Sequence, residues 1–588
     1  MPGLVGFSKK HMDGIKAKSV LQKMQNLITH YNFYAKDDLF YDDFISATRV
    51  HTNIIQKQPQ PYCENGVYVW LDGEFYNKGE LKAKYGITAD TDPELLAGLY
   101  NRDNKFSFLK SIDGLYSIVL YDLIRKKLFL ITDRYGLRHL YFMVKDNAIV
   151  WGSEVKVMLA FPNFHPIINK QSVEQFFGIG YLLENNTWFE NVELVPSGTV
   201  LSWDLINNKM SNYRYWWWDE IKPITGKLNE TEIVSELGRI FDDAVKRRCR
   251  KEERVGLMLS GGLDSRAILS AMPVTEYPTH AVTFGQKGCD DVKIAAMAAH
   301  IKGAHHHVYE LTQANWLQPR INGVWLTDGQ MDLMHMHGIE GLNSTKDLFD
   351  VNLNGFAGDL ILGGSYLKRT AYFDSEINES QAVETMDCER KAVNNLEIYR
   401  GLRKTDYYFI QNRVRRFTSG GPKYLLSLIE DRKPFFDNKL IELAYSLPDS
   451  YRFNSYIYKE MLLRQYPGFY KNIPWQRTGM PIGLSNFSSF LVSFNKKTIR
   501  RLSAIGLQSN SRNNYTDYPK WIREEPAKSF FQQILSSLEA LYRKYIPYEQ
   551  VISDLNDHFG GKDRSVNLCR YLTFEIWLQQ VIKGDHRD

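Results

Sequence analysis

The chain has 588 residues, of which 44% are hydrophobic and 24% charged, with a formal net charge of +5. At roughly 100–200 residues per domain this length predicts about two to four domains, and the small charge gives no reason to expect a nucleic-acid partner. There is no C-x-x-C pair, no apolar run of about 18 residues and no signal-peptide-like N-terminus. We therefore expect a cytoplasmic protein without a membrane segment.

The first part of the chain is predicted to be β-structure. Five runs of β-branched and aromatic residues are separated by short polar turns, which is typical of antiparallel strands. These runs cover residues 66–76, 115–123, 126–134, 140–146 and 148–154. So many short strands predict two packed sheets, an N-terminal antiparallel β-sandwich over residues 1–215, with a helical insert at 172–183.

A domain boundary is expected where the composition changes. RYWWWDEIKPITGK (214–227) has three consecutive tryptophans followed by Pro and Gly. We assign 216–227 as a linker whose tryptophans seal the domain interface, and a ligand-stacking role is the less favoured alternative. The charge run KRRCRKEER (246–254) is either a phosphate-binding patch or the solvated last turn of a helix. The helix dipole favours the second interpretation.

From residue 228 to 588 the pattern predicts a second domain. Residues 231–251 have helical periodicity and are followed by an apolar strand at 255–260, a helix at 265–272 and a strand at 279–285. Strand–helix–strand is the unit of a parallel α/β sheet, and the remainder is predicted to be mainly helical. The fold class is therefore a two-domain α+β and α/β chain.

The loop VGLMLSGGLDSR (255–266) carries the clearest chemical signal. An apolar strand runs into Ser260, Gly261 and Gly262, and a helix is predicted to begin near Asp264. Adjacent glycines permit a sharp turn, and the exposed N–H groups with the helix N-terminus favour an anion. An acidic residue there implies a metal between it and phosphate, so Asp264 is a predicted Mg²⁺ ligand. The loop lacks the Walker A pattern and resembles the S-G-G-x-D-S PP-loop of enzymes that cut ATP between its α and β phosphates.

With this loop in place, the chain resembles the asparagine synthetase family over nearly its full length. The similar stretches are DGEFYN (72–77), TDRYGLRHLYF (132–142), GSEVKVML (152–159), SGGLDS (260–265), LNGFAGDLILGG (353–364), RKPFFDNKLIELAYSLP (432–448) and TGMP (478–481). The resemblance implies an N-terminal glutaminase domain with the N-terminal-nucleophile hydrolase fold. It also implies a C-terminal ATP-pyrophosphatase synthetase domain that uses ATP and Mg²⁺.

Two departures from the family affect the first domain. The family has a nucleophilic cysteine where this chain has Pro2, which cannot supply a thiolate. Asp72 stands where the family has an asparagine that stabilises the oxyanion, and a carboxylate would repel it. Arg49, Glu74 and Asp92 stand where the family holds the charged ends of glutamine. We therefore predict an inactive glutaminase domain, kept as a structural remnant or a partner-binding surface.

The resemblance carries over more completely in the second domain. Asp264 and Asp359 occupy the two positions that hold Mg²⁺ in the family, and with Arg477 they are the predicted catalytic residues. Arg477 replaces a family lysine and keeps the cationic role. Phe356 lies in the substrate pocket, where asparagine synthetases have Glu and β-lactam synthetases use Tyr, so neither base is available. The residues expected to bind ATP are Met258, Ser260, Gly261, Gly262, Asp264, Ser265, Phe284, Asn354 and Gly355.

The run His305–His306–His307 suggests a metal cluster at first sight. Consecutive residues of a strand point to opposite faces, which is unfavourable for binding one ion. We therefore favour a structural role for these histidines.

Three functions remain open. The first is an AMP-forming amide ligase that activates a small-molecule or peptide carboxylate for attack by an amine or ammonia, as in the β-lactam and lasso-peptide macrolactam synthetases. The second is an asparagine synthetase-type enzyme supplied with free ammonia or with ammonia from a separate glutaminase. The third is a pseudoenzyme that binds nucleotide without turnover. A homodimer or a separate partner protein is compatible with each.

Overall fold

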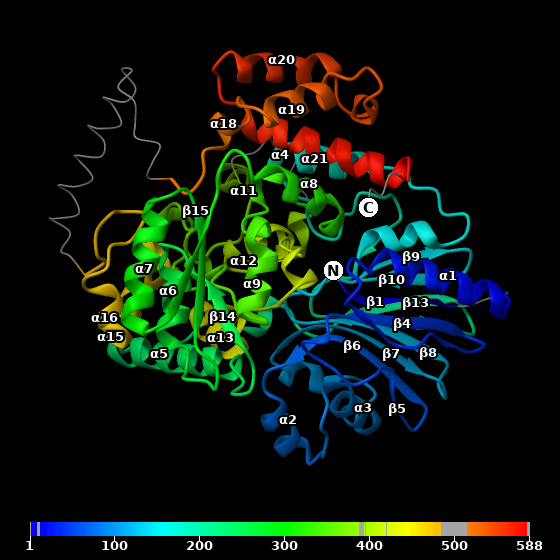
Figure 1. Ribbon diagram of the computed structural model, residues 1–588. Helices are drawn as coiled ribbons and strands as arrows, with labels where there is room; N and C mark the ends of the chain where they lie inside the picture. The colour runs from blue at the N-terminus through cyan, green and yellow to red at the C-terminus, as the bar shows by residue number, and fades with distance from the viewer. Residues whose placement is uncertain are drawn as a thin grey trace.

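The structure is a computed structural model that describes residues 2–8, 12–386, 393, 395–418, 420–483 and 514–584. Two antiparallel sheets form the N-terminal part (Figure 1). The first has the order β11 (Glu193–Leu194), β9 (Tyr141–Lys145), β10 (Ala148–Gly152), β1 (Gly3–Ser8), β4 (Ile45–His51) and β2 (Ala35–Lys36), with β3 (Phe40–Tyr41) on β4. The second has the order β13 (Lys209–Arg214), β12 (Thr199–Asp204), β8 (Lys127–Thr132), β7 (Gly114–Asp122), β6 (Val67–Phe75) and β5 (Tyr62–Glu64).

The two antiparallel sheets pack face to face. Trp70 from the second sheet and Trp151 from the first belong to one buried cluster between them. Along β6 the neighbours of Trp70, Val69 and Leu71, point the other way and join a cluster with α3 (Asp92–Arg102). This alternation is the period of two expected of a strand buried on both faces. The prediction of antiparallel sheets is confirmed, and the predicted helical insert is α4 (Lys170–Ile179), which ends at Gly180 with φ +91°.

A parallel sheet forms the centre of the second part. Its order is β16 (His305–Glu310), β15 (His280–Gly285), β14 (Val255–Met258), β17 (Val351–Leu353) and β18 (Glu430–Arg432). The flanking helices are α5 (Glu230–Arg247), α6 (Leu263–Ala271) and α7 (Asp290–Lys302). Because all of its strand pairs are parallel, the carboxyl ends of β14, β15 and β17 meet at one edge.

The last helices bridge the two parts of the molecule (Figure 1). They are α18 (Tyr518–Trp521), α19 (Ala527–Leu535), α20 (Tyr548–Phe559) and α21 (Ser565–Ile582). On α21, Phe574 packs on Trp188 of the N-terminal part with ring centroids 5.2 Å apart. Within the described ranges, none of the helices combines the length and the apolar character that crossing a bilayer requires.

The tryptophan run lies at the contact between the two parts. Trp216 and Trp218 are buried, and Trp218 stacks on Tyr407 at a centroid distance of 4.5 Å. On the N-terminal side both rings contact Tyr135. The prediction that these aromatic residues seal the interface is confirmed, while the linker bounds 216–227 stay a prediction.

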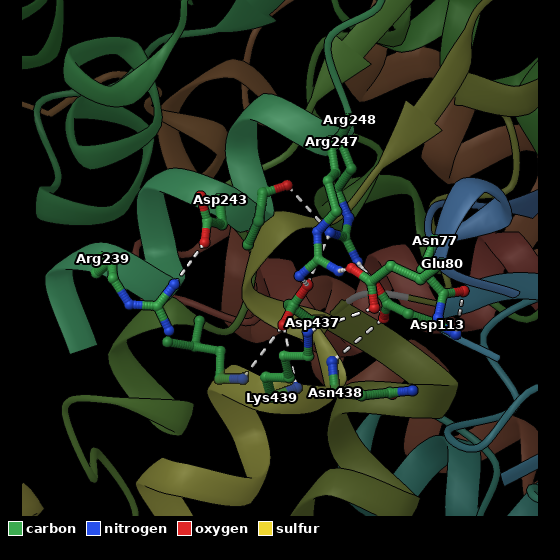
Figure 2. Close-up of polar contacts among 12 residues, drawn as sticks. Asn77, Glu80, Asp113, Arg239, Asp243, Arg247, Arg248, Asp437, Asn438 and Lys439 are labelled. Atoms are coloured by element: carbon green, nitrogen blue, oxygen red, sulfur yellow. Dashed lines mark hydrogen bonds and ion pairs between the residues drawn. The ribbon is translucent and has the colours of Figure 1, made fainter. Parts of the chain in front are cut away.

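The charge run 246–254 also lies at this contact, so its assignment as a solvated helix end is wrong. Arg248 is fully buried and donates hydrogen bonds to Asp113 at 3.3 Å and to Asp437 at 3.3 Å (Figure 2). Arg247 pairs with the same Asp437 at 2.7 Å. The helix end is covered by the first part of the chain, and carboxylates from both sides neutralise its arginines. Burial and the charge of Asp437 raise the pKa of Asp113 to about 7.

Candidate active site

A cavity of about 1090 Å³ lies at the carboxyl edge of the parallel sheet. This is the edge where open parallel sheets bind their ligands. The predicted site residues that line it are Met258, Ser260, Gly262, Asp264, Ser265, Phe284, Asn354, Gly355, Phe356, Asp359 and Arg477. The structure therefore brings together residues that are more than 200 positions apart in the sequence.

The S-G-G loop is held by its own hydroxyl groups. The Ser260 N–H donates to Ser265 Oγ at 3.1 Å, and the Gly262 N–H donates to Ser260 Oγ at 3.2 Å. The Gly261 N–H donates instead to Asp291 Oδ1 on α7 at 2.8 Å, and Gly261 is not part of the cavity wall. Of the residues predicted to bind an anion here, Ser260, Gly262 and Ser265 line the cavity and Gly261 does not, and the anion site itself stays a prediction.

The loop that follows β17 presses against the start of α6. A Cβ on Gly355 would lie 2.8 Å from the Ser265 nitrogen, and one on Gly358 would lie 2.7 Å from Asp264 Cγ. Only glycine permits this approach. Between them, Phe356 is 40% exposed and faces the cavity. The consequence is that Asp359, at the start of α10 (Gly358–Ile361), is brought against Asp264.

The two carboxylates form the electrostatic centre of the cavity. Asp264 accepts hydrogen bonds from the Asp359 N–H at 2.8 Å and from the Tyr458 hydroxyl at 2.9 Å. Burial and the charge of Asp359 raise the pKa of Asp264 to about 8, and burial raises that of Asp359. A cation between two such carboxylates relieves both shifts.

The donor set fits Mg²⁺ held jointly with phosphate. Oxygen ligands are the ones Mg²⁺ prefers, and it commonly takes only one or two protein carboxylates. In the described part of the chain, no group of three or more His, Cys, Asp or Glu residues is arranged to hold a metal. The remaining ligands at Asp264 and Asp359 would therefore be phosphate oxygens or water.

Two cations stand beside the S-G-G loop. The Arg477 guanidinium lies 5.7 Å and the Lys459 ammonium 5.6 Å from the ring centre of Trp475, and both line the cavity. The Gln476 N–H donates to the Gly261 carbonyl at 3.2 Å. These groups are positioned to balance phosphate charge next to the carboxylates.

Arg266 is an organising residue to which the sequence assigned no role. Its buried guanidinium donates to the carbonyls of Gly261 at 3.2 Å, Ile473 at 3.3 Å and Pro474 at 3.0 Å. It thereby joins the S-G-G loop to the segment that carries Arg477. The arginine directly after SGGLDS was the available signal, but its partners Ile473 and Pro474 lie 207 and 208 residues away. Tyr458, the partner of Asp264, belongs to no motif.

The remaining edge of the cavity is a network of amides. The Met258 N–H donates to Asn352 Oδ1 at 2.9 Å, and Asn352 and Asn354 both donate to Asp431 Oδ1, at 2.7 and 2.9 Å. Phe284 lies nearly parallel to His337, with ring centroids 6.5 Å apart. These groups form the wall where an adenosine was expected.

The predicted glutaminase pocket is different, because most of its polar groups already have partners within the protein. Pro2 is buried at the head of β1. Arg49 donates to Asp37 Oδ2 at 2.6 Å and to the carbonyls of Gln56 and Gln58 at 2.9 Å each. All three guanidinium nitrogens of Arg49 are thus engaged within the domain.

Gln56 fills the neighbouring part of that pocket. Its side-chain amide donates to Asp92 Oδ2 at 2.7 Å and to the Gly73 carbonyl at 3.1 Å. Its backbone is left-handed, with φ +46°, a strained conformation for glutamine. Asp92 also accepts from the Phe75 N–H at 3.0 Å and pairs with Lys78 at 3.2 Å.

Glu74 points to the other part of the molecule. It holds Arg432 through two hydrogen bonds of 2.7 and 2.8 Å and Arg250 through one of 2.6 Å. Burial acts to raise the pKa of Glu74, but the two guanidinium groups hold it below its ordinary value. Glu74 is therefore an interface residue in this structure.

Asp72 also faces the interface. Its Oδ1 lies 3.6 Å from Arg138 Nη1, and Arg138 pairs with Glu430 of β18. The Asp72 Oδ2 atom is buried without a hydrogen-bond partner among the described residues.

Consecutive histidines of β16 point to opposite faces of the sheet, as expected for a strand. His306 contacts the Thr283 hydroxyl at 2.9 Å, whereas His307 contacts His280 at 2.9 Å on the other face. The alternation of the three histidines is confirmed, with His305 and His307 both beside His280, and their structural role stays a prediction.

Comparison with known proteins agrees with this architecture. Residues 1–216 match the glutamine amidotransferase domain family, and residues 236–419 match the asparagine synthase family. An asparagine synthetase (glutamine-hydrolysing) of Methanocaldococcus jannaschii is 27% identical over 51% of this chain and 59% of its own length. Asparagine synthetase 2 (glutamine-hydrolysing) of Bacillus subtilis is 24% identical over 67% of this chain and 59% of its own length.

The chain thus spans about three-fifths of the length of both relatives. Among solved structures, the allosteric regulatory enzyme of purine biosynthesis aligns with a TM-score of 0.27 and 14% identity, covering 52% of this chain and 80% of that one. From the two domain matches and the related proteins, the chain belongs to the asparagine synthetase family.

Proposed function

We propose that this protein is an ATP- and Mg²⁺-dependent amide ligase that activates a carboxylate as an acyl-adenylate and releases AMP and pyrophosphate. The observation that carries the proposal is the carboxylate pair Asp264 and Asp359, which lies beside the S-G-G loop and lines one large cavity. Two adjacent carboxylates with raised pKa are costly to keep without a cation and a charged ligand.

In the first step, a carboxylate oxygen of the substrate attacks the α-phosphorus of ATP, and the bond to the β-phosphate breaks. Ser260, Gly262 and Ser265 would hold the departing pyrophosphate, and Arg477 and Lys459 would balance its charge. Asp264 and Asp359 would hold Mg²⁺, which when bound neutralises phosphate charge. In the second step, an amine nitrogen bonds to the acyl carbon, AMP leaves, and the nitrogen loses a proton to water.

The nitrogen, in this proposal, does not come from glutamine hydrolysed on the same chain. Pro2 carries no nucleophile, and Asp72 presents a carboxylate where an oxyanion would develop. Gln56 supports the same conclusion, because its carboxamide holds Asp92, the group expected to bind the glutamine amine. At the contact between the two parts, Arg138 lies 3.6 Å from Asp72 and forms a buried ion pair with Glu430.

Phe356 supports a substrate other than aspartate. A phenyl ring exposed in the cavity accepts no proton and favours an apolar group. An amine entering from solvent, or one carried by the substrate itself, would meet the acyl-adenylate there.

The test is pyrophosphate release from MgATP with a panel of carboxylates, each with ammonium or an amine. We expect at least one carboxylate to give pyrophosphate, AMP and a new amide. The result against the proposal is nucleotide binding with no pyrophosphate from any member of a broad panel, which would instead indicate a nucleotide-binding pseudoenzyme.

A further inference from the structure

Three arginines of one helix have different surroundings. The π-helix Ile410–Thr418 carries Arg413, Arg415 and Arg416. Arg415 donates to the Val195 carbonyl at 2.7 Å, and Arg416 donates to the carbonyl of Glu184 at 2.5 Å, both in the N-terminal part. These two residues therefore anchor the helix across the domain interface.

Arg413 points instead into the active-site cavity, which it lines. Its Nε is buried without a hydrogen-bond partner, and no ion pair joins its guanidinium to a described residue. The guanidinium carbon lies 5.6 Å from the ring centre of Tyr366, and that ring packs on Phe409 at 4.8 Å. The side chain is thus held in place by aromatic contacts while its donors stay available.

An unpaired guanidinium in such a cavity is poised for an anion from outside the protein. Arg413 is half-buried, but leaving its buried Nε without an acceptor costs free energy, and the planar fork of arginine matches a carboxylate through two parallel hydrogen bonds. Arg413 and Asp359 line the same cavity. An anion bound by Arg413 would therefore share this cavity with the proposed metal position.

The ATP phosphates have other partners. Arg477 and Lys459 flank Trp475, beside the S-G-G loop, and Gln476 is hydrogen-bonded to that loop. Arg413 comes from the π-helix, together with Val414 and Thr418, which also line the cavity. We propose that Arg413 binds the substrate carboxylate and positions it for attack on the α-phosphate, an inference that rests on the proposed function.

The first test needs no turnover. The full chain is treated with phenylglyoxal, which modifies accessible arginines, and Arg413 is followed by mass spectrometry. The conditions are no ligand, Mg²⁺ with α,β-methylene-ATP, and the same nucleotide with acetate, L-aspartate or L-glutamate. We expect the carboxylates to protect Arg413 and the nucleotide alone to leave it reactive. The exposed Arg464 serves as the internal reference.

Protection by nucleotide alone would make Arg413 a phosphate ligand and overturn the inference. A lack of protection by every carboxylate would also overturn it. Either result can be read even if no pyrophosphate is formed, so failure of this inference and failure of the proposed ligase activity remain distinct.

The second test uses Arg413→Gln and Arg413→Lys with whichever carboxylate supports pyrophosphate release. Loss of a charge-assisted pair predicts a KM for the carboxylate raised about 10-fold or more in Arg413→Gln, with the KM for MgATP unchanged. Arg413→Lys should recover part of the loss. A raised KM for MgATP with an unchanged KM for the carboxylate contradicts the assignment. A purely structural role of Arg413 would lower kcat without raising the KM for the carboxylate selectively, and this result also contradicts the assignment.

Discussion

The two pockets of this protein differ in whether their polar groups are already satisfied. In the pocket of the N-terminal part, Arg49 and Asp92 are occupied by groups of the same domain, including Gln56. In the cavity of the second part, Asp264 and Asp359 are neighbours, and the Arg413 Nε has no hydrogen-bond partner among the described residues. Buried polar groups are normally paired, so groups left unpaired around a cavity indicate a missing ligand. The Asp72 Oδ2 atom of the first pocket also lacks a hydrogen-bond partner, but its other polar groups have one, and this difference supports our proposal that the second pocket carries the activity.

The largest effect is expected at the carboxylate pair. Asp264→Asn removes a predicted metal ligand and should lower pyrophosphate release at least about 100-fold, since losses of 10²–10³-fold follow removal of one stabilising group from a charged transition state. Excess EDTA should abolish the wild-type activity. Asp243→Asn, on the exposed surface of α5, is the matched control and should be unaffected. Near wild-type release by Asp264→Asn would place the metal elsewhere.

The next effect concerns stability at the domain contact. Glu74→Gln leaves the buried Arg432 with Glu253 as its one remaining carboxylate and should lower the free energy of unfolding by about 1.5–3 kcal/mol. The folded-state pKa of Glu74 lies below its unfolded value, so this contribution is present above the unfolded pKa and is lost as pH falls through the folded pKa. Denaturant titrations at neutral and acidic pH, with Glu80→Gln as the exposed control, measure it. Equal stability of Glu74→Gln and Glu80→Gln at neutral pH would refute the interface role.

A smaller, pH-dependent effect is expected at Asp113. The pKa of Asp113 in the folded state is raised to about 7, above the unfolded value of 3.8. Its contribution to the free energy of unfolding is therefore fully present below the unfolded pKa and is lost as pH rises through about 7. The stability of the wild-type protein relative to Asp113→Asn should therefore decrease between these values, by up to about 1.4 kcal/mol per pH unit. Unfolding free energies at several pH values, with Asp219→Asn as the exposed control, test this. A pH-independent difference would mean that Asp113 stays ionised.

The smallest effect is expected in the first pocket. Gln56→Ala removes the side chain that fills it and should leave pyrophosphate release unchanged, as should Gln58→Ala, whose side chain is exposed. Neither variant should release glutamate from glutamine, because Pro2 still supplies no thiolate. Glutamate formation by either variant, or by the wild type, would show that the first pocket is catalytic.

Local motifs explain why much of the cavity was predictable. The strand, loop and helix around Ser260–Ser265 are contiguous, so residue spacing alone places their groups at the sheet edge. Arg248 was misassigned because its partner Asp437 is 189 residues away, and a charge run looks the same whether it meets water or a second domain. Gln56 and Arg413 belong to no motif. Their roles depend on what surrounds each side chain, which only the tertiary structure provides.

The source of the amide nitrogen tests the central claim most directly. The protein is given MgATP, a carboxylate that supports pyrophosphate release, and either amide-¹⁵N glutamine or ¹⁵N-labelled ammonium or amine. The product is then analysed by mass spectrometry and the solution for glutamate. The account predicts label from ammonium or the amine, none from glutamine, and no glutamate. Label from glutamine in the product, with matching glutamate, would contradict it.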